Sequence, residues 1–225
     1  GMTFLDVRRE AELSILGTLP RDRRETALLV DIGGGNTKGG CLLASGKYAT
    51  FAVPFGTLTF SALAKKKDVR DAKSLIKLGD ETLAPLMKTQ LSALPNLAKR
   101  DRVYLSGGMV WTAATFAHPG DAKSFTALTL KDVEAFEGKL LASPGAYPVV
   151  DLSAVTDKQA RQRALAEMAR VKKVYSPAQA LAGTQILKSV LRQLGGDKRF
   201  YFARHGYLGW LLAYVTETAV RAKST

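Results

Sequence analysis

The residues of this chain that are best suited to chemistry lie together between Asp31 and Lys38, in the stretch DIGGGNTK. An apolar run ends at Asp31, which places a carboxylate where it can orient a metal ion or a water molecule. Three glycines follow and remove Cβ atoms where the backbone doubles back, so that their N–H groups can converge on an oxyanion. Asn36 and Thr37 then add side-chain hydrogen-bond donors, and Lys38 adds a positive charge. We therefore predict a phosphate site made by Gly33, Gly34, Gly35, Asn36, Thr37 and Lys38.

A plain hairpin is the alternative interpretation of this stretch, because glycine clusters mark turns in many β proteins. A hairpin needs neither three consecutive glycines nor an aspartate before them, and this favours phosphate binding. The stretch is neither a Walker A loop nor a dinucleotide-binding fingerprint, since it lacks GxxxxGK[ST] and is followed by a predicted strand.

A second glycine pair follows a short apolar run at Arg102–Ser106. Ser106, Gly107 and Gly108 lead into a predicted apolar helix, Met109–Phe116, and the free N–H groups at a helix N-terminus bind anions. An ordinary loop between a strand and a helix gives the same pattern. Because the first glycine turn predicts the same kind of site, the binding interpretation is favoured here. We therefore add Ser106, Gly107 and Gly108 to the predicted phosphate site.

Apolar runs around these loops predict the elements that position them. Two strands are predicted within Ala27–Leu43 and a third over Tyr48–Phe55, which together form a three-stranded meander with the glycine turn at one end. Helical spacing of apolar residues predicts further helices at 9–16, 57–67, 71–94, 129–141, 157–171, 177–194 and from His205 onward, and strands at 102–106 and 199–203. Pro85 is expected to divide or kink the helix over 71–94.

Composition sets outer bounds on the class of protein. The chain has 225 residues, 46% hydrophobic and 24% charged, which is typical of a soluble globular protein. No apolar run approaches the roughly 20 residues that span a bilayer, and the charged N-terminal residues do not resemble a signal peptide, so we expect no membrane association. The single cysteine, Cys41, cannot form an internal disulfide, which favours a cytoplasmic location. One Cys and two His exclude a Cys/His zinc cluster.

The charge balance is strongly basic, with 33 Lys and Arg against 20 Asp and Glu and a net charge of +13. Such a field raises the local concentration of polyanions. Polyphosphate, a phosphorylated nucleotide and nucleic acid are all partners of this kind, and a solvated basic surface is the alternative. The chain has no nucleic-acid-binding motif of recognised spacing, so we do not predict nucleic acid as its partner.

The order of strand, glycine hairpin, two strands, helix, strand and helix is typical of the ribonuclease-H-like (actin-like ATPase) fold. Within that group the chain resembles the exopolyphosphatase and guanosine pentaphosphate phosphohydrolase (Ppx/GppA) family. Asp31–Lys38 is similar to the family's DIGGGSTE loop. Weaker similarities follow in order along the chain: Glu10-Ala11 with Leu13 and Gly17 to EEARL…G, Phe55–Phe60 to MGxVxF, Leu105–Gly108 to a second glycine loop, Tyr175–Leu187 to R-x-x-x-x-P-A-G, and Gly206–Leu211 to GLREGL.

This resemblance implies an α/β domain with a mixed sheet, in which the three-stranded glycine-turn meander is flanked by helices. Residues 1–225 would form one ribonuclease-H-like domain, equivalent to the family's second domain, with the first domain absent. The implied activity is hydrolysis of a phosphoanhydride bond in polyphosphate or guanosine pentaphosphate. Asp31 would be a catalytic residue and a ligand of Mg²⁺ or another divalent cation, which with the glycine loop would hold the charge of the phosphates.

The chain differs from the family pattern at three places, and these differences raise an alternative function. The family's catalytic Glu aligns with Thr3, or with Asp6 after a two-residue gap; Lys38 replaces the Glu that ends DIGGGSTE; and Tyr207-Leu208 replaces Arg-Glu. Each change removes a carboxylate or its partner. The alternative to a hydrolase is a non-catalytic polyphosphate- or nucleotide-binding regulatory protein, while a small ATP-dependent kinase would lack its first phosphate loop. Because half of a two-lobed fold leaves an apolar face uncovered, we also expect self-association, which light scattering tests.

Overall fold

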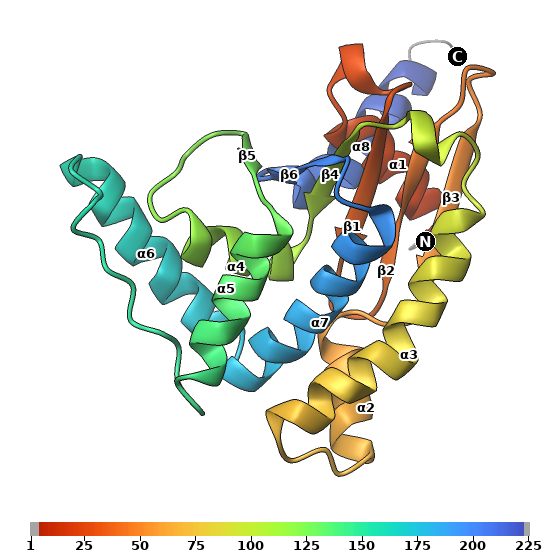
Figure 1. The fold of residues 1–225 in the computed structure, drawn as a ribbon. Helices are drawn as coiled ribbons and strands as arrows, with labels where there is room; N and C mark the ends of the chain where they lie inside the picture. Colours follow the sequence, from red (N-terminus) through yellow and green to blue (C-terminus); the bar gives the residue numbers. More distant parts are fainter. Residues whose placement is uncertain (1–4, 223–225) are drawn as a thin grey trace.

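The structure is a computed structural model that describes residues 5–222, and its centre is a six-stranded mixed sheet (Figure 1). The strand order is β3-β2-β1-β4-β6-β5. β2 pairs antiparallel with β1 and β3, β4 runs parallel to β1 and β6, and β5 is antiparallel to β6. The strands are β1 (Ala27–Ile32), β2 (Thr37–Leu42), β3 (Tyr48–Val53), β4 (Arg102–Ser106), β5 (Phe125–Ala127) and β6 (Arg199–Ala203). The predicted α/β class, with a mixed sheet and a three-stranded meander, is confirmed.

Eight α-helices flank the sheet in the described part of the chain, and the predicted helices agree with them within a few residues. They are α1 (Val7–Thr18), α2 (Thr57–Lys66), α3 (Ala72–Ser92), α4 (Gly108–Ala117), α5 (Leu130–Leu141), α6 (Lys158–Val174), α7 (Pro177–Leu194) and α8 (Gly209–Ala222), with short 3₁₀ turns at Arg21–Arg23, Leu97–Lys99 and Gly206–Leu208. Of the two effects expected of Pro85, division of the helix is wrong, because α3 continues through the proline with Leu83 and Met87 buried on either side of it; a kink at Pro85 stays a prediction.

Strand β1 is buried on both faces because its side chains alternate between two cores. Leu28, Val30 and Ile32 contribute to the larger core, which α2–α7 complete. Ala27 and Leu29 point the other way and join a small cluster with α1. The alternation has a consequence for the site, because Asp31 follows Ala27 and Leu29 onto the α1 face.

The helices divide between the two faces of the sheet (Figure 1). α1 packs on β1, β2 and β3 and against α8, whereas α4 packs on β1, β4 and β6 from the opposite face. α7 forms the centre of this second layer, in contact with α2, α3, α4 and α5. The end of the sheet at which β1, β4 and β6 terminate is left to loops, and the predicted site lies there.

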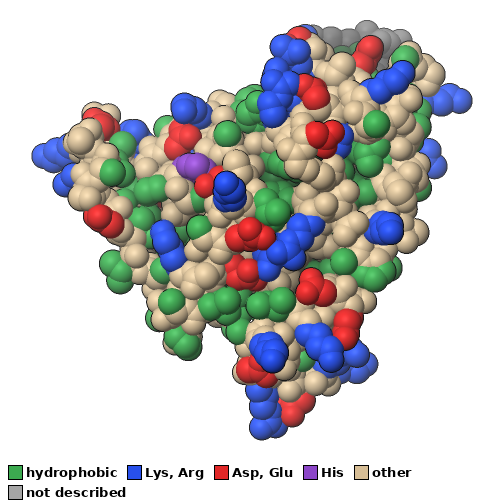
Figure 2. Space-filling view, in the orientation of Figure 1, with side chains coloured by type: hydrophobic (Ala, Val, Ile, Leu, Met, Phe, Trp, Pro, Cys, Tyr) green, Lys and Arg blue, Asp and Glu red, His purple; other side chains and the backbone are tan. Residues whose placement is uncertain are grey.

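Charged side chains are interspersed over the face in view rather than gathered into one basic patch on it (Figure 2). The net charge of the chain therefore does not identify a binding surface on this face. Among residues 5–222, no helix has both the length and the apolar composition that crossing a membrane requires.

Candidate functional site

The glycine turn joins β1 to β2 and is fixed from one side by α2. The Gly33 amide donates to the Asn36 carbonyl at 3.0 Å, which closes the turn. The carbonyls of Gly33 and Gly34 accept hydrogen bonds from three amides in the first turn of α2, those of Thr57, Leu58 and Thr59, at 2.9–3.2 Å, and the Thr59 hydroxyl donates to Gly35 O at 2.9 Å. The turn thus supplies the acceptors that the N-terminus of α2 requires.

Three amides of the same turn are left with free hydrogens. Within residues 5–222, the N–H groups of Gly34, Gly35 and Asn36 donate to no protein acceptor. Gly35 is exposed, and a Cβ atom added to it would meet nothing within 4 Å. None of the three glycines has a positive φ, so the turn is not the alternating left- and right-handed nest that binds anions elsewhere. What it offers a ligand is a short row of free amides.

Asp31 stands at the end of β1 in the middle of a polar row. Strand register places it opposite Lys38 on β2 and opposite Ser106 on β4. The Ser106 hydroxyl donates to Asp31 Oδ1 at 2.8 Å, and the Lys38 ammonium lies 3.1 Å from Asp31 Oδ2. The structure therefore brings together residues from both predicted loops, and it uses both oxygens of the predicted catalytic carboxylate within the protein.

Lys38 points into the protein, toward α1. Its side chain is only 5% exposed, and its ammonium lies 3.1 Å from Glu10 Oε1 and 3.3 Å from Asn36 Oδ1, in addition to Asp31. Burial alone would lower the pKa of this ammonium, but the carboxylates of Asp31 and Glu10 outweigh the loss of solvent and raise its pKa above the ordinary value. Lys38 is thus a charged group whose charge is compensated internally.

The two predicted hydroxyl donors are also engaged within the protein. Thr37 is fully buried and donates to Phe55 O at 2.8 Å, and Ser106 is 1% exposed and donates to Asp31. In this structure the hydroxyls of Thr37 and Ser106 support the loops, and the free donors are backbone amides.

The second predicted loop opens onto a cavity of about 380 Å³. Gly107 directly follows β4 and is the N-cap of α4, and no side chain caps that helix. The cavity lies at the carboxyl ends of β4 and β6, which is where open α/β sheets commonly bind ligands. Its lining comprises Gly107, Gly108, Trp111, Glu167, Arg170, Phe202, Ala203, Arg204, His205 and Tyr207.

Two arginines bring positive charge to this cavity. Arg204 follows β6 and is held by hydrogen bonds from its guanidinium to the carbonyls of Asp121 and Lys123. Arg170, on α6, lies over the Trp111 ring at 5.6 Å and pairs with Glu167 at 2.7 Å. With one carboxylate against two guanidiniums, the cavity favours an anionic ligand.

The predicted magnesium ion does not fit the residues around Asp31. Among residues 5–222, no group of three or more His, Cys, Asp or Glu side chains could hold a metal ion. Both Asp31 oxygens have partners, and the space between Asp31 and Glu10 contains the Lys38 ammonium. We derive no step through a metal ion from this arrangement.

Three residues in this region were not predicted from the sequence to be site residues. Glu10 lies in the first turn of α1 and meets Lys38 only in the folded chain, and Arg170 and Arg204 come from elements with no motif. Of the two residues aligned with the family's catalytic Glu, Thr3 lies outside the described residues. Asp6 is the N-cap of α1, where it accepts a hydrogen bond from the Arg9 amide.

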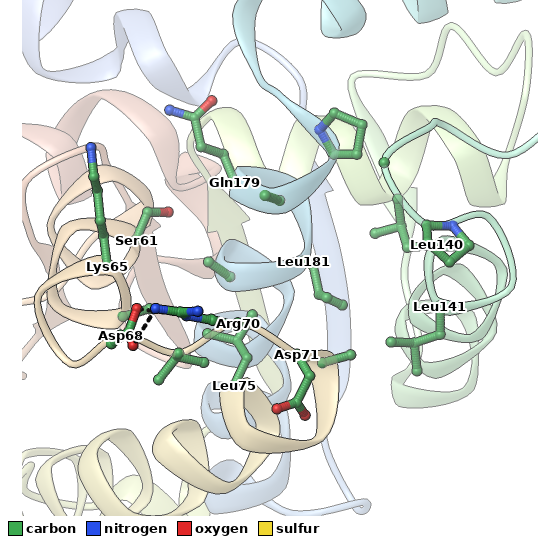
Figure 3. A pocket seen from close by; sticks show the side chains of 18 residues that line it. Ser61, Lys65, Asp68, Arg70, Asp71, Leu75, Leu140, Leu141, Gln179 and Leu181 are labelled. Carbon is green, nitrogen blue, oxygen red and sulfur yellow. Dashed lines mark hydrogen bonds and ion pairs between the residues drawn. The ribbon is translucent and has the colours of Figure 1, made fainter.

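A separate cavity of about 460 Å³ lies among the second half of α2, the start of α3, the end of α5 and the start of α7 (Figure 3). Aliphatic side chains form much of its wall, including Leu75, Leu140 and Leu181. Arg70 at its edge is paired with Asp68 at 2.8 Å, as the dashed line in Figure 3 shows. This cavity contains no residue of the predicted phosphate site and has no excess of positive charge that would favour a polyanion.

Comparison with solved structures identifies the fold. The chain matches the Aquifex aeolicus Ppx/GppA phosphatase, type II variant, with a TM-score of 0.57 and 18% identity over 89% of this chain and 61% of that one. An exopolyphosphatase-like protein matches with a TM-score of 0.60 and 18% identity, covering 94% and 65% of the two chains. An exopolyphosphatase from Cytophaga hutchinsonii matches with a TM-score of 0.51 and 18% identity, covering 92% and 64%.

These matches confirm that the chain has the actin-like domain fold seen in Ppx/GppA structures. The chain spans about 61–65% of the length of the proteins named above. No protein-family model matches the sequence, and no curated protein matches it with significance. At 18% identity the likeness establishes the fold alone, so the chemistry must be argued from the residues of this chain.

Proposed function

We propose that this chain binds a phosphate chain, either inorganic polyphosphate or the phosphates of a nucleotide, at the carboxyl ends of β1, β4 and β6. The supporting observation is that one cavity combines the uncapped N-terminus of α4 with Arg170 and Arg204. Guanidinium groups form charge-assisted hydrogen bonds with phosphate, and a helix N-terminus adds amides and a favourable dipole. Gly107 and Gly108 both line this cavity, although the space of their missing Cβ atoms is filled by Ile32 O and the Tyr175 hydroxyl.

The free amides of Gly34, Gly35 and Asn36 are, in this proposal, a second anchoring point at the end of the neighbouring strand β1. They carry no net charge, and the adjacent group of Glu10, Asp31 and Lys38 has one more negative than positive charge. We therefore assign the charge recognition to the α4 cavity. Ser106 and Asp31 would hold the two loops together rather than contact the ligand.

Arg170→Ala is expected to weaken binding of inorganic triphosphate about ten- to hundredfold, since a hydrogen bond to a charged group is worth about 1.5–3 kcal/mol. Isothermal titration calorimetry at fixed ionic strength would measure this. Arg163→Ala is the matched control, because Arg163 is an exposed arginine on the same helix that does not line the cavity. Equal losses in the two variants would contradict a defined site and indicate general attraction to a basic surface.

Phosphoanhydride hydrolysis is the second candidate function. The fold shared with exopolyphosphatase structures favours it, as does the carboxylate of Asp31 at the end of β1. The engagement of both Asp31 oxygens disfavours it, since a general base needs an oxygen free to accept a proton from water.

Phosphate release from long-chain polyphosphate with Mg²⁺ would distinguish the two functions. We expect wild-type protein to release no more phosphate than Asp31→Asn, while still binding the polymer. Release by wild-type protein that Asp31→Asn abolishes would replace the binding proposal with a hydrolase.

A further inference from the structure

The ammonium of Lys38 lies at the centre of a ring of oxygen donors. Asp31 Oδ2 and Glu10 Oε1 are each 3.1 Å from Nζ, and Asn36 Oδ1 is 3.3 Å away. The three donors come from β1, α1 and the glycine turn, so the tertiary fold gathers them at one point. Carboxylate and amide oxygens are the ligands that hard divalent cations take in proteins.

We propose that Lys38 is the resident cation of this turn and takes the position between Asp31, Glu10 and Asn36 that a divalent metal ion would otherwise occupy. The inference does not require that an anion binds, and so it stands apart from the proposed function. It explains how two convergent carboxylates beside the glycine turn, on α1 and β1, are compatible with a folded chain.

Charge and space both support this assignment. Two carboxylates that approach the same point repel each other unless a cation lies between them, and because the Asp31 and Glu10 side chains are only 16% and 32% exposed, solvent weakens that repulsion only in part. Lys38 is 4% exposed and stands directly opposite Asp31 in the strand register, so its ammonium reaches this point from within the sheet. A divalent ion could enter only by displacing a group of the same charge sign.

The assignment makes a specific prediction for Mn²⁺ binding. Electron paramagnetic resonance measures the concentration of free Mn²⁺, and thermal unfolding is a second measurement of binding. Wild-type protein should show no saturable Mn²⁺ site at the turn. Lys38→Met keeps an unbranched side chain that is one atom shorter, removes the charge and frees the oxygens. It should gain one site with a dissociation constant of about 0.1–1 mM, which is the range of weak oxygen-ligand sites, and Mn²⁺ should raise its melting temperature.

Two controls define the site. Lys47→Met removes an exposed lysine from the β2–β3 hairpin and should gain no Mn²⁺ binding. The double variant Lys38→Met with Asp31→Asn should bind Mn²⁺ at least tenfold more weakly than Lys38→Met alone. A saturable site in wild-type protein that Asp31→Asn removes would overturn the proposal, as would a folded Lys38→Met variant that gains no site.

A measurement on the wild-type side chain covers the case in which Lys38→Met does not fold. Nitrogen-15 spectra of lysine Nζ groups should show a solvent-protected ammonium that shifts in Asp31→Asn and in Glu10→Gln. Because Lys188 is also a buried, paired lysine, the response to Asp31→Asn and Glu10→Gln identifies Lys38: if no protected ammonium shifts in either variant, Lys38 is not the resident cation.

Discussion

Replacing Glu137 by alanine is expected to lower the free energy of unfolding by about 3–5 kcal/mol, because it leaves a buried charge without its partner. Glu137 projects from α5 and accepts a hydrogen bond from Gln185 Nε2 at 2.6 Å. Its second oxygen pairs with Lys188 Nζ of α7 at 2.6 Å, and the two charged side chains are 10% and 6% exposed. Urea unfolding followed by circular dichroism would measure the change.

An exposed ion pair between the same two helices provides the matched control. Glu134 on α5 pairs with Arg192 on α7 at 2.8 Å, with side chains 41% and 45% exposed. Glu134→Ala should cost less than about 1 kcal/mol. The double variant Glu137→Leu with Lys188→Met should recover most of the stability, since no charge remains buried. A cost for Glu137→Ala as small as that of Glu134→Ala would show that water reaches Lys188.

This buried pair illustrates which parts of the fold the sequence could predict. The apolar spacing of Pro177–Leu194 predicts α7 and one buried face. In the structure α7 lies between four other helices, so its buried surface extends to Gln185, Lys188 and Ser189. Periodicity shows that a helix has an apolar face, but it does not show that its polar side chains are also buried.

The strands, like α7, could be predicted from the sequence only in part. The apolar runs of β1, β4 and β6 predict them directly, whereas β5 has three residues, only one of them buried, and gives no periodic signal. β5 forms because β6 offers a free edge to which it pairs. Its existence depends on a partner distant in the sequence.

The candidate site also has parts that the sequence predicts and parts that it does not. The two glycine loops and Asp31 could be found because each interrupts an apolar run with residues that a simple turn does not require. Their meeting through Ser106 and Asp31 follows from the pairing of β1 with β4. The inward direction of Lys38 could not be predicted, because its partner Glu10 belongs to a helix whose position only the tertiary fold sets.

Gly107→Ala is expected to cost about 2–6 kcal/mol of stability and to abolish binding of inorganic triphosphate. Gly107 has φ 103° and ψ 165°, a region that is essentially restricted to glycine and costs another residue about 1–3 kcal/mol. A Cβ atom there would also lie 2.1 Å from Ile32 O, so β1 and β4 would have to separate, and overpacking of this kind costs about 1–3 kcal/mol more. The same displacement would move the start of α4 and the wall of the proposed binding cavity. Urea unfolding and calorimetry would measure the two effects.

Gly195→Ala separates the two causes of this cost. Gly195 ends α7 with φ 89° and ψ 162°, close to the conformation of Gly107, but the nearest neighbour of an added Cβ is the side-chain oxygen of Asp197 at 3.2 Å. It should therefore incur the backbone strain alone, about 1–3 kcal/mol, and leave triphosphate binding intact. If the two variants lose equal stability, the contact with Ile32 is not rigid. If Gly107→Ala also binds triphosphate normally, the start of α4 is not where the phosphates bind, and the proposed function fails at its main anchoring point.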